Sequence, residues 1–211
     1  MIVTKIKRNR LNYDVYIDEE LAFTLTDEGL YKSRLKTGVE IEQTEHLNEI
    51  IREDEVKRCK NRALRIITDS PKSASKVAEK LKKENFSDFA VSHALDFLGE
   101  YSFIDDQRLA ENITKKAVRA NSSVRQIKNS LYKKGIKKED IEKAVSEVDS
   151  DQEEENAIKV AIKKYNTLKG KSDEEVLRKV YYTLSYKGFS YSACDKAMNK
   201  IKSMLRNYED Y

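Results

Sequence analysis

The chain has 211 residues and a net charge of +4, with 37% charged residues, 39% apolar residues, six Gly, one Pro and no Trp. This composition favours a soluble, helical protein with thin cores. The chain has no apolar run of membrane-spanning length and no secretory start, so we expect a cytoplasmic protein that contacts no membrane. Two cysteines, Cys59 and Cys194, are too few and too distant for a metal site or a disulfide framework.

The first segment is predicted to be rich in β-structure. Apolar residues alternate with more polar ones in Ile2–Ile6, Tyr13–Ile17 and Leu21–Leu25, which is the period of half-buried strands. Short turns near Asn9–Asn12 and Asp18–Glu20 would join these runs into a three-stranded antiparallel meander. The first strand and its turn are basic, and the charges either protect an edge strand or bind a partner: Lys5, Lys7, Arg8 and Arg10.

Helical periodicity replaces strand periodicity after the meander. Asp27–Leu35 is predicted to form a short helix, and a longer helix is predicted to begin near Thr44 and to end before Ser70-Pro71. A first repeat would begin inside this long helix, at about Val56.

Three stretches of the chain then share one pattern. Each is predicted to contain a helix that stops at a residue with positive φ, then a turn with one buried apolar residue, and then a second helix. Stacked helical units produce such a period, because no copy buries its apolar face alone. The corresponding residues are Val77, Leu81, Asn85, Phe86, Val91, Ala94 and Leu95; Ile127, Leu131, Gly135, Ile136, Ile141, Ala144 and Val145; and Val180, Leu184, Gly188, Phe189, Cys194, Ala197 and Met198.

Polar residues at the predicted helix starts are interpreted as N-caps. Ser73 and Ser123 occupy equivalent places in the first two repeats, and Ser172 or Asp173 would cap the third. The adjacent carboxylates of Asp105 and Asp106 are better explained as an N-cap and a first-turn acid than as a metal or acid–base site, since no further ligand accompanies them.

Charge is strongly segregated in the middle of the chain. Residues 115–138 carry nine basic side chains and no acid, and residues 139–155 carry nine acids and one lysine. The acids suit the starts of two helices. An ordinary exposed helix mixes both signs, so the basic run favours binding to a polyanion over a merely solvated face. Its residues are Lys115, Lys116, Arg119, Arg125, Lys128, Lys133, Lys134, Lys137 and Lys138.

The repeat register also predicts a shared outer face. Arg125 and Lys133 correspond to Arg178 and Tyr186, and Asn129 corresponds to Tyr182. All lie on the side of each middle helix away from its apolar stripe. If exposed, arginine with tyrosine suits a protein contact or stacking on bases. The alternative is that Tyr182 or Tyr186 covers a neighbouring repeat.

Several motifs together resemble the RecX family. The resemblance covers about Val56 to the C-terminus, although Asn85 stands where the first repeat more usually has Gly, and only part of the family has a strand-rich start. The motifs are Phe103-Ile104-Asp105-Asp106 followed by Arg108-Leu109-Ala110, then Arg125-Gln126-Ile127 with Leu131 and Lys134-Gly135-Ile136, and upstream Ser73 with Lys80-Leu81.

The resemblance implies a function that the composition does not show. Members of the family are tandem three-helix repeat proteins that regulate the RecA recombinase in homologous recombination, DNA repair and the SOS response. It implies a non-enzymatic modulator that lies in the groove of the RecA filament on single-stranded DNA and limits filament growth, ATP hydrolysis and strand exchange. The alternative is a general DNA- or RNA-binding helical-repeat module that acts through charge. An enzyme is the weakest hypothesis, because the sequence has no catalytic triad, phosphate-binding Gly loop or metal cluster.

We therefore expect a mainly α fold, an elongated tandem array of three three-helix repeats preceded by a small N-terminal three-stranded antiparallel β segment. The expected segments are 1–43, 44–103, 104–150 and 151–211. The chain is expected to be monomeric and to need no cofactor. Its expected partners are the RecA filament and single-stranded DNA, with double-stranded DNA as a further candidate. The candidate contact residues are the nine basic residues of 115–138, with Arg178, Tyr182, Tyr186, Lys5, Lys7, Arg8 and Arg10.

Overall fold

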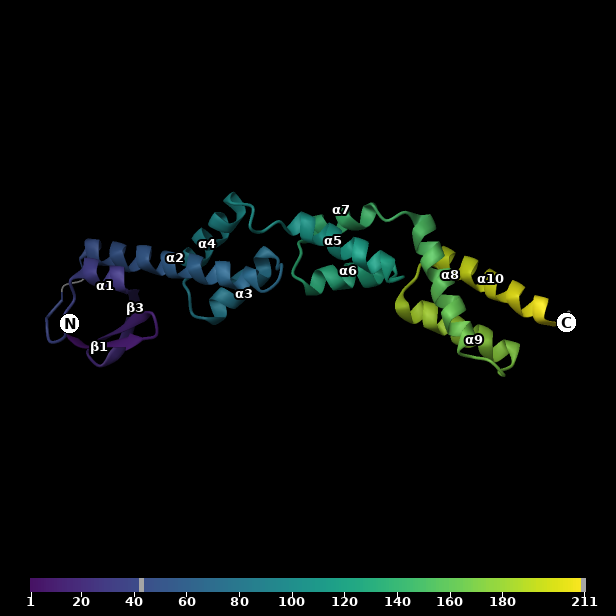
Figure 1. The fold of residues 1–211 in the computed structure, drawn as a ribbon, viewed down its shortest axis with the longest axis horizontal. Helices are drawn as coiled ribbons and strands as arrows, with labels where there is room; N and C mark the ends of the chain where they lie inside the picture. Colours follow the sequence, from purple (N-terminus) through teal and green to yellow (C-terminus); the bar gives the residue numbers. More distant parts are fainter. Residues whose placement is uncertain (42–43, 210–211) are drawn as a thin grey trace. The chain divides into compact units, whose positions relative to one another are not determined.

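The computed structural model describes residues 1–41 and 44–209, whose elements are labelled in Figure 1. The chain divides into two compact units, Met1–Ile104 and Asp105–Tyr211. The predicted fold class, mainly α with a small N-terminal antiparallel sheet, is confirmed.

The first unit opens with a three-stranded antiparallel sheet in the order β1-β2-β3. The strands are β1 (Val3–Asn9), β2 (Asn12–Ile17) and β3 (Glu20–Thr26). The predicted meander and the places of its two turns are therefore confirmed. Strand structure extends slightly beyond the expected limit at Leu25, because β3 ends at Thr26 and an isolated bridge joins Ile2 to Glu40.

The side chains of the sheet do not follow the simple alternation that the sequence predicts. The pairing of β1 with β2 shifts register between Val3 and Lys5, so that Val3 and Ile6 both pack in the small core of the sheet. Ile2 and Leu21, expected on the packed face, are 48% and 57% exposed. A bulge adds one residue to a strand and reverses which side chains face the core, so alternation alone gives the wrong face.

Two helices, α1 (Asp27–Ser33) and α2 (Glu45–Thr68), follow the sheet. Asp54 of α2 is buried, and its carboxylate accepts hydrogen bonds from the backbone N–H of Thr26 at 3.1 Å, from the Thr26 hydroxyl and from Arg58 at 3.0 Å. A Cβ at Gly29 would overlap this carboxylate. A buried charge with all of these partners fixes α2 against the end of β3 and the start of α1.

The first helical group consists of α2, α3 (Ala74–Lys83) and α4 (Asp88–Glu100). Cys59, Ala63 and Ile66 of α2 pack on apolar residues of α3 and α4 in one core. The predicted break before Ser70-Pro71 is confirmed, since α2 ends at Thr68.

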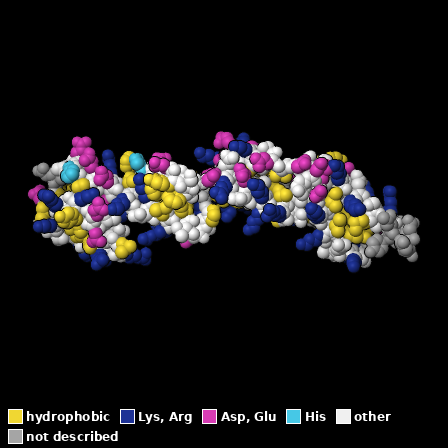
Figure 2. All heavy atoms as spheres, turned by 45° about the horizontal axis from the view of Figure 1, so that its top comes forward, with side chains coloured by type: hydrophobic (Ala, Val, Ile, Leu, Met, Phe, Trp, Pro, Cys, Tyr) yellow, Lys and Arg dark blue, Asp and Glu magenta, His cyan; other side chains and the backbone are white. Residues whose placement is uncertain are grey.

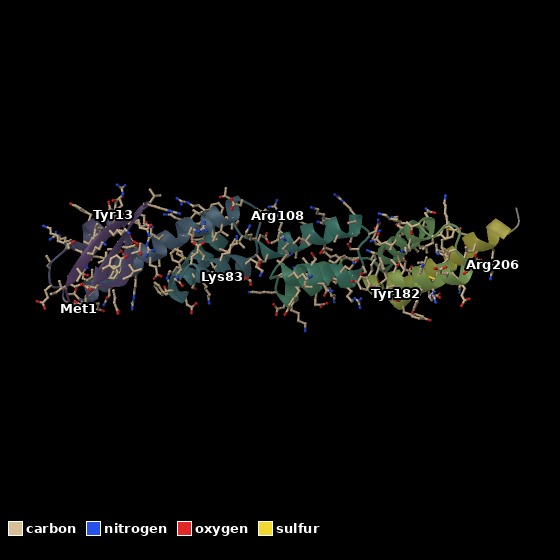
Figure 3. The ribbon with its side chains drawn as sticks, turned by 90° about the horizontal axis from the view of Figure 1, so that it is seen from below. Met1, Tyr13, Lys83, Arg108, Tyr182 and Arg206 are labelled. Carbon is tan, nitrogen blue, oxygen red and sulfur yellow. The ribbon has the colours of Figure 1, made fainter. Side chains whose placement is uncertain are left out.

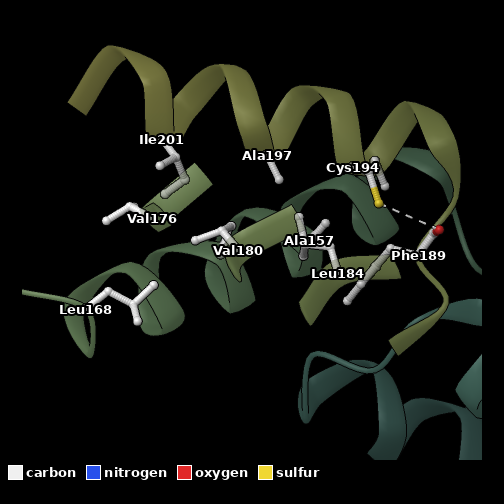
Figure 4. Close-up of a cluster of buried hydrophobic side chains, with 11 residues drawn as sticks. Ala157, Leu168, Val176, Val180, Leu184, Phe189, Cys194, Ala197 and Ile201 are labelled. Carbon is white, nitrogen blue, oxygen red and sulfur yellow. Dashed lines mark hydrogen bonds between the residues drawn. The ribbon is translucent and has the colours of Figure 1, made fainter. Parts of the chain in front are cut away.

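The second unit contains two further helical groups. The first comprises α5 (Asp106–Arg119), α6 (Val124–Lys133) and α7 (Lys138–Ser146), and the second comprises α8 (Ser150–Asn166), α9 (Asp173–Lys187) and α10 (Tyr191–Glu209). Each group has its own apolar core. Figure 4 shows the core of the last group, where Val180 and Leu184 of α9 face Ala197 and Ile201 of α10.

The repeated turn has the same backbone geometry in all three groups. Asn85, Gly135 and Gly188 have φ values of 62°, 73° and 77°, as predicted for the residues that stop the helix. The next residue then donates its N–H back to the helix, at 3.3 Å from Phe86 to Leu81, 3.2 Å from Ile136 to Leu131 and 3.3 Å from Phe189 to Leu184. These bonds satisfy carbonyl groups that the end of a helix leaves without partners.

The predicted helix caps are confirmed. The side chains of Ser73, Ser123 and Asp105 accept hydrogen bonds from the backbone three residues later, and Ser172 rather than Asp173 caps the third middle helix. Ser123 also forms a capping box with Gln126. Asp105 and Asp106 therefore act at the start of α5, which is the structural interpretation favoured from the sequence.

Side chains from α6 and α8 join the two helical groups of the second unit. Ser123 donates its hydroxyl to the carbonyl of Lys187 at 2.6 Å, and Glu153 accepts the N–H of Val124 at 2.9 Å. Asn156, which is 1% exposed, donates to the carbonyl of Val118 at 3.2 Å. Glu153 lies in the first turn of α8, as predicted for the acids that follow residue 138, and it is buried because it accepts this bond at the junction.

Both cysteines are buried. Cys194 takes the core position predicted from the repeat and lies 3.8 Å from the Phe189 carbonyl (Figure 4). Burial raises the pKa of Cys194 and raises the pKa of Cys59 to about 11.

Candidate nucleic-acid interface of the second unit

The nine basic residues predicted from the sequence lie on three consecutive elements of the second unit. In Figure 2, dark blue side chains are prominent over the part of the chain that α5–α7 form. Lys115, Lys116 and Arg119 belong to the last turns of α5, Arg125, Lys128 and Lys133 belong to α6, and Lys134, Lys137 and Lys138 belong to the turn and the start of α7.

Part of this basic charge is neutralised within the unit. Lys128 pairs with Glu142 at 2.7 Å, and Lys115 lies 3.7 Å from Glu111. Five others are exposed and form no ion pair with any residue that the structure describes: Lys116, Arg119, Lys133, Lys137 and Lys138. We call these five residues the free basic set. They keep their full charge available for an anionic partner.

Arg125 differs from the other basic residues, because it supports the fold. Its Nη2 donates hydrogen bonds to the carbonyls of Ser185 at 3.3 Å and Tyr186 at 3.1 Å, at the end of α9. A guanidinium at a helix C-terminus satisfies free carbonyls and the negative end of the helix dipole. The shared outer face predicted from the repeat is exposed, but its first arginine is engaged within the protein.

Exposed tyrosines accompany the basic residues. Tyr182 and Tyr186 on α9 are 69% and 77% exposed, and the centroids of their stacked rings are 6.3 Å apart. Figure 3 shows Tyr182 projecting away from the ribbon. Neither ring covers the neighbouring repeat, so the alternative interpretation of these two residues is wrong. Arg178, one turn earlier, is exposed as well.

Tyr132 is an exposed aromatic residue that the sequence reasoning missed. It lies on α6 beside Lys133 and is 77% exposed. A signal was present, because a helix that buries Ile127 and Leu131 directs the residue after Leu131 outward. Tyrosine rings beside free cations suit a nucleic-acid strand, which offers both phosphates and base faces.

The remaining candidates belong to the first unit. Lys5, Lys7 and Arg8 lie on β1, and Arg10 lies in the turn after it. In the described sheet β1 is the edge strand beside β2, and on its other side Val3 forms backbone hydrogen bonds with Gly38 and Val39. Edge protection suits Lys5 and Lys7.

Within the described residues, no group of three or more His, Cys, Asp or Glu side chains is placed to hold a metal ion. None of the described helices is long and apolar enough to span a membrane.

Comparison with known proteins gives the family. The regulatory protein RecX of Clostridioides difficile (strain 630) is 35% identical over 214 residues, which cover 100% of this chain and 98% of that relative. The chain belongs to the RecX family. A second relative, the regulatory protein RecX of Clostridium perfringens (strain SM101 / Type A), is 32% identical and covers 92% of both chains. The resemblance found in the sequence motifs is thus confirmed.

Family models match two parts of this chain, and solved structures share its fold. The model for the first three-helix domain of RecX matches residues 59–98, and the model for the third matches residues 151–198. The fold is similar to a crystal structure of regulatory protein RecX, with a TM-score of 0.67, 24% identity and coverage of 94% of this chain and 98% of that one. A crystal structure of RecX from Lactobacillus salivarius gives a TM-score of 0.66 at 23% identity over 71% of this chain and 98% of that one.

Proposed function

We propose that this chain is a non-enzymatic regulator of the RecA recombinase. It binds in the groove of the RecA filament on single-stranded DNA and limits filament growth, ATP hydrolysis and strand exchange. The observation that carries the proposal is the free basic set on α5–α7, with exposed tyrosines on α6 and α9, in a chain of the RecX family.

The free basic set supports a polyanionic partner for an electrostatic reason. DNA holds a condensed layer of counterions, and each phosphate that a lysine or arginine neutralises releases them. Such contacts give affinity without sequence preference, which suits a protein that follows a filament wherever it forms.

The same surface also favours a second function, a nucleic-acid-binding module that acts through charge alone. In that case the chain would inhibit RecA only by occupying DNA. The two functions differ in whether the loss of inhibition follows the loss of DNA occupancy.

A charge-reversal variant separates the two functions. Lys133→Glu, Lys137→Glu and Arg178→Glu change exposed residues that have no ion pair among the described residues, whereas Arg125 is left intact because it holds α9. The matched control reverses three exposed lysines of the same unit, Lys163, Lys200 and Lys202. Unchanged melting transitions would verify that both variants are folded.

The readout is DNA-dependent ATP hydrolysis by RecA at matched DNA coverage. A regulator that lies along the filament loses its effect in the first variant even when residual DNA binding is saturated, and the control keeps the effect. Full inhibition by the first variant whenever DNA occupancy is matched would instead establish the charge-only function.

A further inference from the structure

A second basic surface lies in the first unit, in a groove of about 750 Å³ between the β1–β2 turn and α2. The turn contributes Arg10 to one wall, and α2 contributes Arg58, Arg62 and Arg65 to the other. Of these four residues, the sequence singled out Arg10 alone.

Helix geometry explains why three arginines of α2 face the same groove. Positions 58, 62 and 65 are separated by four and three residues, so they form one stripe along the helix. The adjoining stripe of Cys59, Ala63 and Ile66 is buried in the helical core. Packing of that apolar stripe fixes the rotation of α2 about its axis, and the fold places the β1–β2 turn opposite the arginine stripe.

Two of the four arginines have partners inside the unit. Arg62 makes a bidentate contact with Glu84, at 2.6 Å through Nε and 2.5 Å through Nη2. Glu84 raises the pKa of Arg62, and Arg62 lowers the pKa of Glu84. Arg58 binds the buried Asp54 at 3.0 Å and lies 5.8 Å from the centre of the Phe86 ring.

Arg10 and Arg65 provide the uncompensated charge. Both are exposed, and neither forms an ion pair with a described residue. Arg10 has a φ of 58°, in the left-handed region where Gly or Asn is the ordinary residue of a turn. The groove thus has one free cation on each wall, and Glu84, the acid in its lining, is already matched by Arg62.

We propose that this groove binds the phosphodiester backbone of a nucleic-acid strand, as a contact separate from the free basic set. This assignment deepens the proposed function and rests on it for the choice of nucleic acid among polyanions. A guanidinium offers a planar fork that matches phosphate oxygens, and the amide of Asn61 in the same lining adds a neutral donor.

The placement of the free cations favours a strand over a small anion. A small anion needs donors that converge on one point, whereas Arg10 and Arg65 stand on opposite walls of an open groove. A ligand with regularly spaced charges contacts both walls at once. Carboxylates of an acidic protein segment fit the same arginine fork, as Glu84 does with Arg62, so the choice of nucleic acid over such a segment rests on the proposed function.

The test measures binding of the full chain to a fluorescein-labelled oligothymidylate by fluorescence anisotropy over a series of salt concentrations. Arg10→Gln and Arg65→Gln each remove one free cation, and Arg52→Gln is the control, since Arg52 is exposed on the same helix outside the groove. We expect each groove variant to bind severalfold more weakly and to lose about 0.7 from the salt slope, the contribution of one single-strand phosphate contact. The control should bind as the unaltered chain does.

A fourth variant predicts a gain. Glu84→Gln removes the acid from the groove and releases the fork of Arg62, so affinity should rise and the salt slope should steepen by about 0.7. A merely structural role for these arginines predicts no gain. Unchanged melting transitions of all variants would verify that the fold is kept. Arg62→Gln in the Glu84→Gln background should abolish the gain.

Binding by the groove variants that matches the Arg52→Gln control would overturn the proposal. The same measurement is made with a labelled polyglutamate. Variants that weaken polyglutamate binding alone would also overturn the proposal, because the groove would then be specific for acidic protein. RecA is absent from this experiment, and the free basic set is intact in every variant. Failure of the proposed RecA function therefore leaves this result unaffected.

Discussion

The guanidinium of Arg125, near the start of α6, donates a hydrogen bond of 3.1 Å to the carbonyl of Tyr186, near the end of α9. A Cβ placed on Gly188 would overlap this guanidinium. Arg125 thus links the start of α6 to the end of α9. Gly188 is needed at this helix end both because its φ is 77° and because it leaves space for the guanidinium.

The first prediction is a coupling between these two residues. Arg125→Ala should destabilise the second unit by about 1 kcal/mol, the net value of a hydrogen bond from an exposed charged group to a helix end. Gly188→Ala should cost about 2 kcal/mol, roughly half from the positive φ and the rest from overlap with Arg125. In the Arg125→Ala background the second cost should fall to about 1 kcal/mol. Urea unfolding of the unaltered chain, the two single variants and the double variant measures these free energies. Strictly additive costs would contradict the coupling.

The second prediction concerns the repeated core. Leu81, Leu131 and Leu184 are fully buried at equivalent positions. Leu131→Ala should cost roughly 2–5 kcal/mol, and the same substitution at either other leucine should cost a similar amount, because each leaves a cavity in a thin core. Tyr132→Ala, one residue later and 77% exposed, should change stability by no more than about 0.5 kcal/mol. Equal costs at positions 131 and 132 would disprove the assigned helix face.

The third prediction is that stability depends on pH through the ion pair between Glu154 of α8 and Lys196 of α10. The pKa of Glu154 is lowered, first by the hydrogen bond from Lys196 and then by that from Ser192, and Glu154 in turn raises the pKa of Lys196. A carboxyl with a lowered folded pKa stabilises the fold above its ordinary pKa and loses this contribution as pH falls through the folded value. Glu154→Gln should therefore lower Tm at neutral pH, and the difference from the unaltered chain should shrink in acid. A difference that is constant or that grows in acid would exclude this role.

The fourth prediction concerns Asp54, whose side chain is 4% exposed. Asp54→Ala leaves the N–H of Thr26 and the guanidinium of Arg58 without their acceptor, so it should cost on the order of 3 kcal/mol. Hydrogen exchange should quicken in β3 and α1 more than in α4, because the carboxylate joins the first two to α2. Uniform quickening across the first unit would mean that the network does not act locally.

The fifth prediction is a steep salt dependence of DNA binding by the free basic set. If all five cations neutralise phosphates of a single strand, they contribute about −3.5 to the slope of log K against log salt, from about −0.7 per phosphate. Lys137→Gln should reduce that slope by about 0.7, and Lys200→Gln on α10 should leave it unchanged. An affinity that barely changes between low and physiological salt would point to an uncharged contact.

The sequence predicts local features of the fold well, because each depends on a few neighbouring residues. Leu131 recurs at helical spacing, Gly135 permits the positive φ that ends the helix, and Ser123 caps the next helix start, so the repeat could be recognised without coordinates. The register shift between Val3 and Lys5 has no such local signal. Alternation therefore placed Ile2 on the wrong face.

The candidate site is less predictable, because charge pairing joins residues that are distant in sequence. The run from Lys115 to Lys138 is visible in the sequence, yet the carbonyls that engage Arg125 come some sixty positions later. The arginine stripe of α2 follows helical spacing, but only the fold brings the β1–β2 turn opposite to it. Sequence patterns identify which side chains share a helix face, whereas contacts between elements determine which of them are free.

Burial of the chain's two thiols has a practical chemical result. A thiol reacts as its thiolate, and Cys59 and Cys194 are both buried with raised pKa values, so neither is readily alkylated in the folded protein. A single cysteine introduced at an exposed position of either unit would therefore be the fast-reacting thiol of the chain. Fluorophores attached through two such positions, one in each unit, would report the distance between the units in solution and its change when a nucleic acid binds, with both native cysteines left in place.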